Sequence, residues 1–359
     1  MIYVHGGDIY RNRVKLDFSV NINPLGMPEE SVRAAKEALE GCGVYPDYMG
    51  EALCDALAEK EGTERGQVIL GNGAAELIYA VCAAVRNERE ERLEKGGWSP
   101  IRVLTAAPSF QEYEAAAEAA GGETLFYTQK EEEGFLLTEG ILELLDRQRP
   151  QILFLCNPGN PTGVLIPQPL LERIAALCER TGTRLCVDEC FLPFLEEEGR
   201  LTLKHRLEEF PHLIVLRAFT KVYAMPGLRL GYALTADTLF LERMKRSMQP
   251  WNTSIPAQAA GLAALSAKGY PERTRRLIRE EKAWLKEALA GGLAEKVYGS
   301  AADYLFFKAR PDLKERLLEE GILIRSCEGF RGLGPGFFRI GIRTHEENEE
   351  LIRIWQRRL

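Results

Sequence analysis

The chain has 359 residues, of which 45% are hydrophobic and 28% charged, and its net charge of −7 comes without a long basic run. This composition is ordinary for a globular protein with a large core, and it argues against nucleic acid or an anionic membrane surface as a partner. No apolar stretch reaches the ~20 residues of a membrane span, no secretory signal begins the chain, and the eight cysteines form no C-x-x-C pair, so we expect a cytoplasmic protein with reduced thiols and no metal site.

The pattern of apolar residues predicts three parts in chain order. Residues 1–28 read as an irregular arm, and residues 29–40 have the apolar spacing of a short amphipathic helix. Between residues 67 and 234, short apolar runs alternate with helical patterns, which is typical of a mostly parallel sheet with helices on both faces. Residues 256–291 are predicted to be helical, and the remaining strands and helices indicate a small α+β domain.

We therefore predict an α/β fold with boundaries near residues 45 and 250. The arm and first helix form residues 1–44 and pack with the small domain, the large domain spans 45–249, and the small C-terminal domain spans 250–359. The run PWNTSIP at the second boundary is typical of a hinge, because its prolines interrupt regular structure.

Lys221 directly follows a short apolar stretch that includes LIVLR at 213–217, and a Pro-Gly pair comes soon after it. This pattern predicts a lysine on a turn at the end of a buried strand, close to Thr220 and Arg229. Desolvation and nearby positive charge lower the pKa of such an amine and make it a nucleophile towards a carbonyl. A single lysine is more often a solvated surface residue, so this interpretation depends on the other motifs.

Three further motifs lie at the ends of apolar runs. CNPGNPTG spans residues 156–163, LCVDEC leads to Asp188, and GNGAAE opens a helical pattern at Ala74, where free backbone N–H groups favour a phosphate. The last motif also suggests a dinucleotide site. That alternative is weakened because Glu76 replaces the third glycine of the fingerprint and no acidic residue ends the next strand.

These motifs, in this order, resemble those of the fold-type I pyridoxal-phosphate enzymes, the aspartate aminotransferase superfamily, over nearly the whole chain. The resemblance implies pyridoxal 5′-phosphate as the cofactor and Lys221 as the catalytic residue that bonds it. It also implies that Asp188 pairs with the ring nitrogen, that Asn160 bonds the ring hydroxyl and that Phe110 stacks on the ring. The implied phosphate-binding residues are Gly73, Ala74, Ala75, Thr220 and Arg229.

Two positions depart from the pattern of the superfamily. Ala218 stands where many relatives have Ser or Thr, which removes one phosphate contact, and Phe191 replaces the tyrosine that bonds the ring hydroxyl in aminotransferases. Tyr45 resembles the tyrosine that reaches the cofactor phosphate of the neighbouring subunit. The resemblance therefore implies a homodimer with shared active sites.

Two branches of the superfamily fit the substrate side of the chain: the L-threonine-O-3-phosphate decarboxylases of cobalamin biosynthesis and the histidinol-phosphate aminotransferases. HGGD, DFSVNINPLGMP, MPGLRLGY, ILIRSC and FFRIGIR resemble the decarboxylases most, although Asp8 replaces the asparagine of their usual HGGN. A small phosphorylated amino acid is doubly anionic, and each charge needs its own partner. The implied substrate-binding residues are His5, Asn21, Asn160, Arg325 and Arg339.

The reaction expected from this resemblance is decarboxylation of L-threonine O-3-phosphate to (R)-1-amino-2-propanol O-2-phosphate, which makes the protein a lyase. Serine phosphate differs by one methyl group, which contributes only ~1–3 kcal/mol to discrimination. Two alternatives remain open: a histidinol-phosphate-type class I/II aminotransferase, and a non-catalytic ligand sensor with the same fold. Sensors of that kind usually carry a nucleic-acid module, for which this chain has no basic segment.

Overall fold

A computed structural model of the chain describes residues 5–92 and 99–358. Within these ranges the largest sheet has seven strands in the order β2-β8-β7-β6-β5-β3-β4, and only β8 runs antiparallel to its neighbours. The central strands are buried along their whole length, which explains why they are continuous apolar runs rather than alternating patterns. The strands are β2 (Val68–Gly71), β3 (Arg102–Ala107), β4 (Glu123–Thr128), β5 (Ile152–Cys156), β6 (Arg184–Asp188), β7 (Leu213–Ala218) and β8 (Gly231–Leu234).

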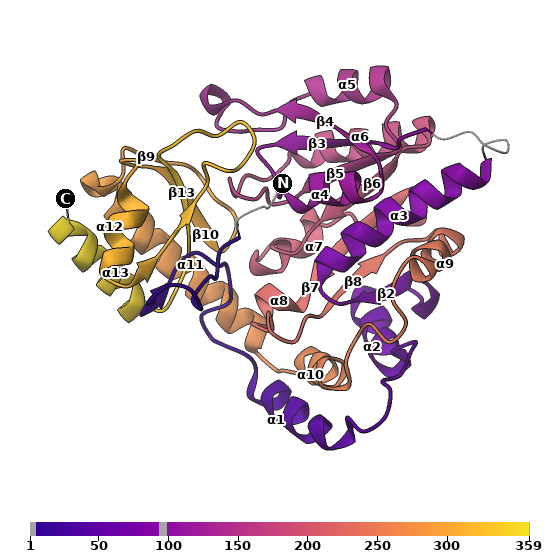
Figure 1. Cartoon of the computed structure of the whole chain (residues 1–359), viewed down its shortest axis with the longest axis horizontal. Coiled ribbons are helices and arrows are strands. Elements are labelled where there is room, and N and C mark those ends of the chain that lie inside the picture. Colours follow the sequence, from indigo (N-terminus) through magenta and orange to yellow (C-terminus); the bar gives the residue numbers. More distant parts are fainter. Residues whose placement is uncertain (1–4, 93–98, 359) are drawn as a thin grey trace.

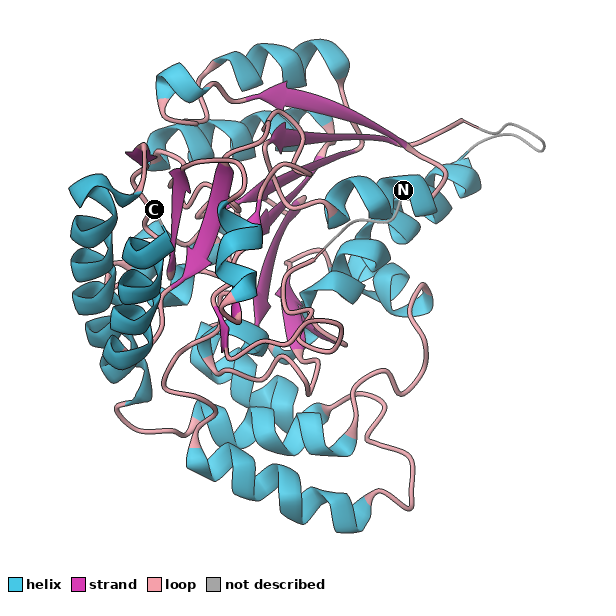
Figure 2. Cartoon of the chain, turned by 60° about the vertical axis from the view of Figure 1, so that its left-hand side comes forward, coloured by secondary structure: helices cyan, strands magenta, loops and turns pink. Residues whose placement is uncertain are grey.

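Helices cover both faces of this sheet, as Figures 1 and 2 show. In α6 (Gln168–Thr181), Leu170, Ile174 and Leu177 recur at helical spacing and are buried, so one apolar face packs against the core. The predicted mostly parallel sheet between helices is confirmed. The other helices of this part are α2 (Glu51–Glu61), α3 (Ala74–Arg92), α4 (Glu112–Ala119), α5 (Gly140–Gln148), α7 (Glu198–Leu201), α8 (Phe219–Val222) and α9 (Thr238–Arg246).

A smaller antiparallel sheet follows in the C-terminal part, where the described residues give four strands in the order β12-β13-β10-β9. Its register places Arg325 and Phe306 on either side of Arg339. This α+β arrangement agrees with the prediction. The elements are β9 (Lys296–Val297), β10 (Tyr304–Lys308), β12 (Arg325–Ser326), β13 (Phe337–Gly341), α11 (Tyr270–Ala288), α12 (Leu313–Glu319) and α13 (His345–Arg358).

The N-terminal residues join distant parts of the chain. β1 (Leu16–Asp17) pairs in parallel with β11 (Ile322–Leu323), and α1 (Glu29–Ala38) packs along α10 (Ile255–Leu265). Because α10 also contacts α2, α1 lies on the side of the large sheet's helices, whereas β1 lies with the C-terminal part (Figure 1). The exact domain boundaries remain a prediction.

Two local expectations need correction. The helical stretch predicted for residues 256–291 is interrupted between α10 and α11, where Gly269 adopts a left-handed conformation with a φ of +67°. Lys221 lies not on an irregular turn but in the one-turn helix α8, which ends before the Pro-Gly pair. None of the helices in the described ranges has the length and apolar character that crossing a membrane requires.

Candidate active site

A cavity of about 500 Å³ opens where the large sheet, the small sheet and the N-terminal arm meet. The carboxyl ends of β6 and β7 contribute its floor, which is where parallel α/β sheets usually bind their ligands. The structure brings most of the residues predicted from the sequence into this cavity. They are His5, Asn21, Ala74, Ala75, Phe110, Asn160, Asp188, Phe191, Thr220, Lys221, Arg229, Arg325 and Arg339.

Two predicted residues do not line the cavity. Gly73 lies just behind it, against the guanidinium group of Arg229. Tyr45 is 74% exposed in the isolated chain, and its ring stacks on Trp251 with centroids 4.4 Å apart. Its predicted contact with a neighbouring subunit therefore remains a prediction.

Lys221 is partly buried and faces the cavity from α8, directly after β7. Burial lowers the pKa of its amine, and the positive charge of Arg339 lowers it further, with a smaller effect of Arg229. The expected low pKa is thus confirmed, and the amine is suited to attack a carbonyl.

Asp188 ends β6 and is buried, and each of its carboxyl oxygens has a protein donor. The backbone N–H of Cys190 donates to Oδ1 at 3.0 Å, and the hydroxyl of Tyr113 donates to Oδ2 at 2.8 Å. Tyr113 is fully buried and stacks on Phe154, with centroids 4.9 Å apart. Burial and the charge of Asp188 raise the pKa of Tyr113, so its hydroxyl keeps the proton that it donates.

Sequence reasoning missed Tyr113. A signal was present, because Tyr113 lies three residues after Phe110, at a spacing that places two side chains on the same side of a helical turn. The rings of Phe110 and Tyr113 meet edge to face at 5.7 Å. Phe110, which is predicted to stack on the cofactor ring, and Tyr113, which bonds Asp188, therefore position each other.

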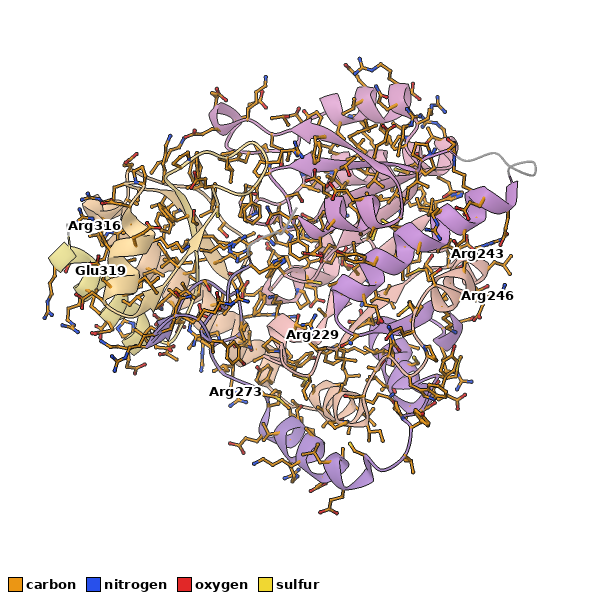
Figure 3. The ribbon with its side chains drawn as sticks, viewed as in Figure 1. Arg229, Arg243, Arg246, Arg273, Arg316 and Glu319 are labelled. Carbon is orange, nitrogen blue, oxygen red and sulfur yellow. The ribbon has the colours of Figure 1, made fainter. Side chains whose placement is uncertain are left out.

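The N-terminus of α3, which the sequence predicts to bind the cofactor phosphate, lies beside Arg229. Gly73 has a φ of +82°, a left-handed conformation that favours glycine, and a Cβ at this position would come within 2.6 Å of Arg229 Nη2, so the guanidinium group lies close against this turn. Free N–H groups and the helix dipole favour an anion here. Arg229 lies near the centre of the molecule, whereas Arg243 and Arg316 lie towards its outer edges (Figure 3).

Arg325 and Arg339 occupy opposite positions on β12 and β13 and are 8% and 7% exposed. Arg339 donates to the side chain of Asn160 and to the carbonyl of Ser19. No carboxylate in the described part of the chain forms an ion pair with either arginine. Burial and the charge of Arg339 lower the pKa of Arg325 to about 10, which shows how strongly the pair needs an anion.

An aromatic pair lies beside Arg339, whose guanidinium group sits 5.3 Å from the centre of the Tyr304 ring. Phe191 is buried and meets Tyr304 edge to face at 5.2 Å, and the Tyr304 hydroxyl donates to the carbonyl of Gly159 at 2.6 Å. Position 191 therefore offers the cavity a ring without a hydroxyl group.

The N-terminal arm contributes part of the cavity lining. His5 Nε2 lies 3.0 Å from Glu112 Oε1, and its imidazole meets the ring of Phe110 edge-on. Asn21 is buried, and its side-chain oxygen has no partner within the described residues. Both residues thus present polar groups towards a ligand, and Glu112 is a second residue that sequence reasoning missed.

A lysine after a sheet strand, a buried acid beside it and an anion site at a helix start define a pyridoxal-phosphate enzyme of fold type I. The family described as aminotransferase class I and II matches residues 13–354, so the chain belongs to that family. Its cofactor is pyridoxal 5′-phosphate. The free backbone N–H groups at the start of α3, together with the Gly73 turn and the neighbouring Arg229, fit the phosphate group of that cofactor.

Relatives in this family carry out two different reactions. Threonine-phosphate decarboxylase of Salmonella typhimurium is 37% identical over 340 residues, 94% of this chain and 89% of that protein. Histidinol-phosphate aminotransferase of Methanosarcina mazei is 33% identical over 341 residues, 94% of this chain and 86% of that protein. The solved structure of histidinol-phosphate aminotransferase from Clostridium acetobutylicum has a TM-score of 0.85 at 26% identity and covers 95% of this chain and 98% of its own.

Proposed function

We propose that the protein is a cytoplasmic homodimeric lyase that decarboxylates L-threonine O-3-phosphate to (R)-1-amino-2-propanol O-2-phosphate, for the nucleotide loop of cobalamin or a related cobamide. The observation that carries the proposal is the buried pair Arg325 and Arg339, which has no carboxylate partner among the described residues. A ligand with both a phosphate and a carboxylate supplies one anion for each guanidinium.

The residues around the cavity have distinct tasks in this reaction. When bound, pyridoxal phosphate accepts the electrons of the Cα bond that breaks. Asp188, held by Tyr113 and the Cys190 N–H, pairs with the ring nitrogen and keeps it charged. Lys221 tethers the cofactor and faces the cavity, where its nitrogen can deliver a proton to substrate Cα after carbon dioxide has left.

The contacts made by the phosphate and carboxylate of the substrate decide which bond at its Cα breaks. Only a Cα bond that stands across the plane of the ring is cleaved, so the contacts that orient the substrate select the reaction. Arg325, Arg339 and His5 enter the cavity from the small sheet and the arm, whereas Lys221 and Asp188 enter it from the large sheet. Phosphate and carboxylate contacts on that side fix the rotation about the Cα–N bond.

Histidinol-phosphate transamination is the second candidate. It is favoured by the 33% identity to the Methanosarcina mazei enzyme, which is close to the 37% identity to the decarboxylase. The same lysine, acid and anion site serve both reactions. Phe191 supports the decarboxylase, because aminotransferases usually have a tyrosine at this position.

Two incubations of the holoenzyme separate the candidates. L-threonine O-3-phosphate without any keto acid is expected to release carbon dioxide and to leave the amine on the product. Histidinol phosphate with 2-oxoglutarate is expected to give no glutamate. Glutamate from the second mixture and no carbon dioxide from the first would overturn the proposal.

Replacing Arg325 with Met tests the anion site itself. We expect kcat/KM for threonine phosphate to fall about 100-fold or more, because hydrogen bonds to charged groups contribute about 1.5–3 kcal/mol each. The matched control is Arg310→Met, since Arg310 lies at the surface in a pair with Asp312. Equal activity in the two variants would remove Arg325 from the substrate site.

A further inference from the structure

Ser19 is a buried residue of the N-terminal arm that bonds two different parts of the substrate site. It is 1% exposed and lines the cavity, and sequence reasoning missed it. Its hydroxyl accepts the backbone N–H of Gly7 at 2.7 Å, and its carbonyl accepts from the guanidinium group of Arg339 at 3.1 Å. Gly7 lies two residues after His5 in the chain. The segment that carries His5 and the side chain of Arg339 are therefore held by the same residue.

The carboxylate of Asp17 fixes the orientation of Ser19. Its Oδ1 accepts the Ser19 backbone N–H at 2.8 Å and the Ser19 hydroxyl at 2.6 Å. Because the hydroxyl gives its one proton to Asp17, its lone pairs are left for the N–H of Gly7. A charged acceptor makes such a bond short and strong, and bonds that follow one another in a chain strengthen each other. Asp17 thus determines where Ser19 presents an acceptor to the arm.

The backbone of Phe18, between these two residues, is tied to both strands that lead to the arginines. Its N–H donates to the carbonyl of Leu323 at 2.8 Å, two residues before Arg325. Its carbonyl accepts the N–H of Gly341 at 2.9 Å, two residues after Arg339. The position of the Asp17 carboxylate is therefore set by the strands that carry the proposed anion-binding pair.

The close contact between the arm and Ser19 also explains the two glycines of HGGD. A Cβ on Gly6 would come within 2.4 Å of the Ser19 carbonyl oxygen, which is the atom that accepts from Arg339. Gly7 has a φ of +83°, a left-handed conformation that favours glycine. The arm thus lies directly against the backbone of Ser19, with no side chain between them.

We propose that Asp17 is a positioning residue, which acts through Ser19 to set the places of His5 and Arg339 in the substrate site. It touches no ligand and forms or breaks no covalent bond. The inference rests on the proposed function in that His5 and Arg339 bind the substrate. Its first test needs no substrate, so the two proposals can fail separately.

Hydrogen–deuterium exchange of the holoenzyme, followed on peptides that contain Gly7, tests the anchoring of the arm. In Asp17→Ala we expect the Gly7 N–H to exchange about fivefold faster or more, because the Ser19 hydroxyl is no longer held towards it. Asp17→Asn keeps an oxygen acceptor and should exchange like the unmodified protein. The control, Asp146→Ala, removes an exposed carboxylate paired with Arg149 and should leave this exchange unchanged. Unchanged exchange in Asp17→Ala overturns the proposal.

Steady-state kinetics with L-threonine O-3-phosphate measure the effect on the substrate site. In Asp17→Ala we expect kcat/KM to fall about tenfold, because His5 and Arg339 lose their fixed positions. Asp17→Asn should stay within about threefold of the unmodified protein, since a neutral oxygen is a weaker acceptor in the same place. The visible absorbance of the bound cofactor should be the same in all variants, because Lys221 and Asp188 come from the large sheet.

Two kinetic outcomes would contradict a positioning role. Equal losses of kcat/KM in the alanine and asparagine variants, or a parallel loss of cofactor, would show that Asp17 only supports the fold. If Asp17→Ala does not fold, Ser19→Ala, which deletes the hydroxyl alone, replaces it in both experiments with the same expected result. A holoenzyme that releases no carbon dioxide from threonine phosphate would overturn the proposed function, and the exchange at Gly7 would still decide the role of Asp17.

Discussion

At the scale of single residues, Asp188, the acid that we propose pairs with the cofactor, depends on a neighbour that does not line the cavity. Tyr113 is 0% exposed, does not line the cavity and donates to Asp188 at 2.8 Å. A charged acceptor makes this bond stronger than one between neutral groups. The phenol fixes the orientation of the carboxylate.

Tyr113→Phe removes this donor and leaves the ring stacking on Phe154 in place. We expect the holoenzyme to lose its cofactor about tenfold more readily, since hydrogen bonds to charged groups contribute about 1.5–3 kcal/mol. Absorbance after dialysis measures the retained cofactor. Tyr127→Phe is the control, because the Tyr127 hydroxyl bonds Thr138 away from the cavity. Equal retention in both variants would mean that Tyr113 does not support Asp188.

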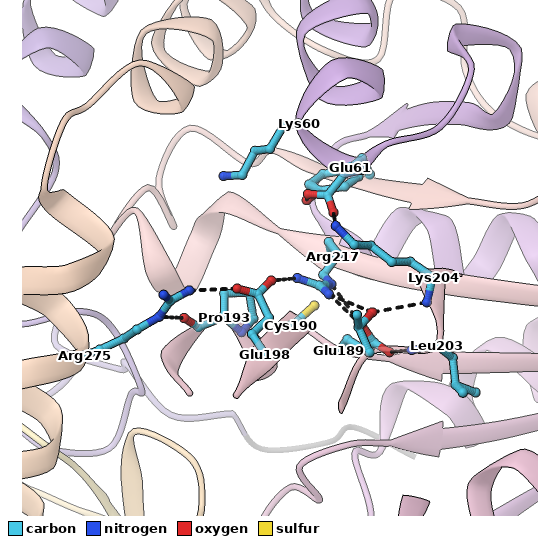
Figure 4. A network of polar contacts seen from close by, with 12 residues as sticks. Lys60, Glu61, Glu189, Cys190, Pro193, Glu198, Leu203, Lys204, Arg217 and Arg275 are labelled. Carbon is cyan, nitrogen blue, oxygen red and sulfur yellow. Dashed lines mark hydrogen bonds and ion pairs between the residues drawn. The ribbon is translucent and has the colours of Figure 1, made fainter. Parts of the chain in front are cut away.

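At the scale of elements, a buried ionic network ties β6, β7 and α11 together (Figure 4). Arg217 of β7 donates to Glu189, the residue after Asp188, at 2.7 Å, and also to Glu198 of α7. Arg275 of α11 reaches Glu198 at 2.8 Å. Because Glu189 and Arg217 are almost fully buried, removing either one would leave the other buried without its ion-pair partner.

Arg217→Met tests the energetic weight of this network. We expect it to lower the free energy of unfolding by about 3–5 kcal/mol, because it leaves Glu189 buried without its partner. The control is Arg243→Met, which removes the surface ion pair of Arg243 with Glu91; Arg243 is labelled in Figure 3. This variant is expected to lower the free energy of unfolding by less than about 1 kcal/mol. Urea unfolding midpoints measure both values, and similar midpoints for the two variants would refute the role of the network.

At the scale of the whole molecule, one region of the surface is unusually apolar. The loop before α2 exposes Val44, Tyr45, Tyr48 and Met49, and Trp251 stacks on Tyr45 beside them. Contiguous exposed aromatic residues are typical of protein–protein interfaces. This patch supports the proposal of a homodimer in which Tyr45 reaches the second active site.

Trp251→Glu places a charge in this patch. We expect the dimer to dissociate at least tenfold more readily, a change of about 1.4 kcal/mol, because the charge must be desolvated in the interface. Sedimentation at several concentrations measures the association. Leu239→Glu is the control, since Leu239 is 78% exposed on α9 outside this patch. A dimer that is equally stable in both variants contradicts the assignment of the interface.

Much of the fold and part of the site follow from local patterns. The apolar runs before Lys221, Asp188 and Asn160 predict parallel strands, and the carboxyl ends of such strands meet at one edge of the sheet. The structure places all three residues in one cavity as that reasoning requires. The break at Gly269 and the short helix α8 were missed, because one turn of backbone leaves little trace in apolar spacing.

The sequence by itself determined which residue types stand at strand ends and at the start of α3, because hydrophobic periodicity and turn residues act over a few positions. The tertiary structure decided which side chains meet across long separations. Arg325 faces Arg339 through the register of two strands, and Tyr113 reaches Asp188 from a separate helix. These relations arise from packing and burial, which turn distant residues into neighbours and give their charges effect in a medium of low dielectric constant.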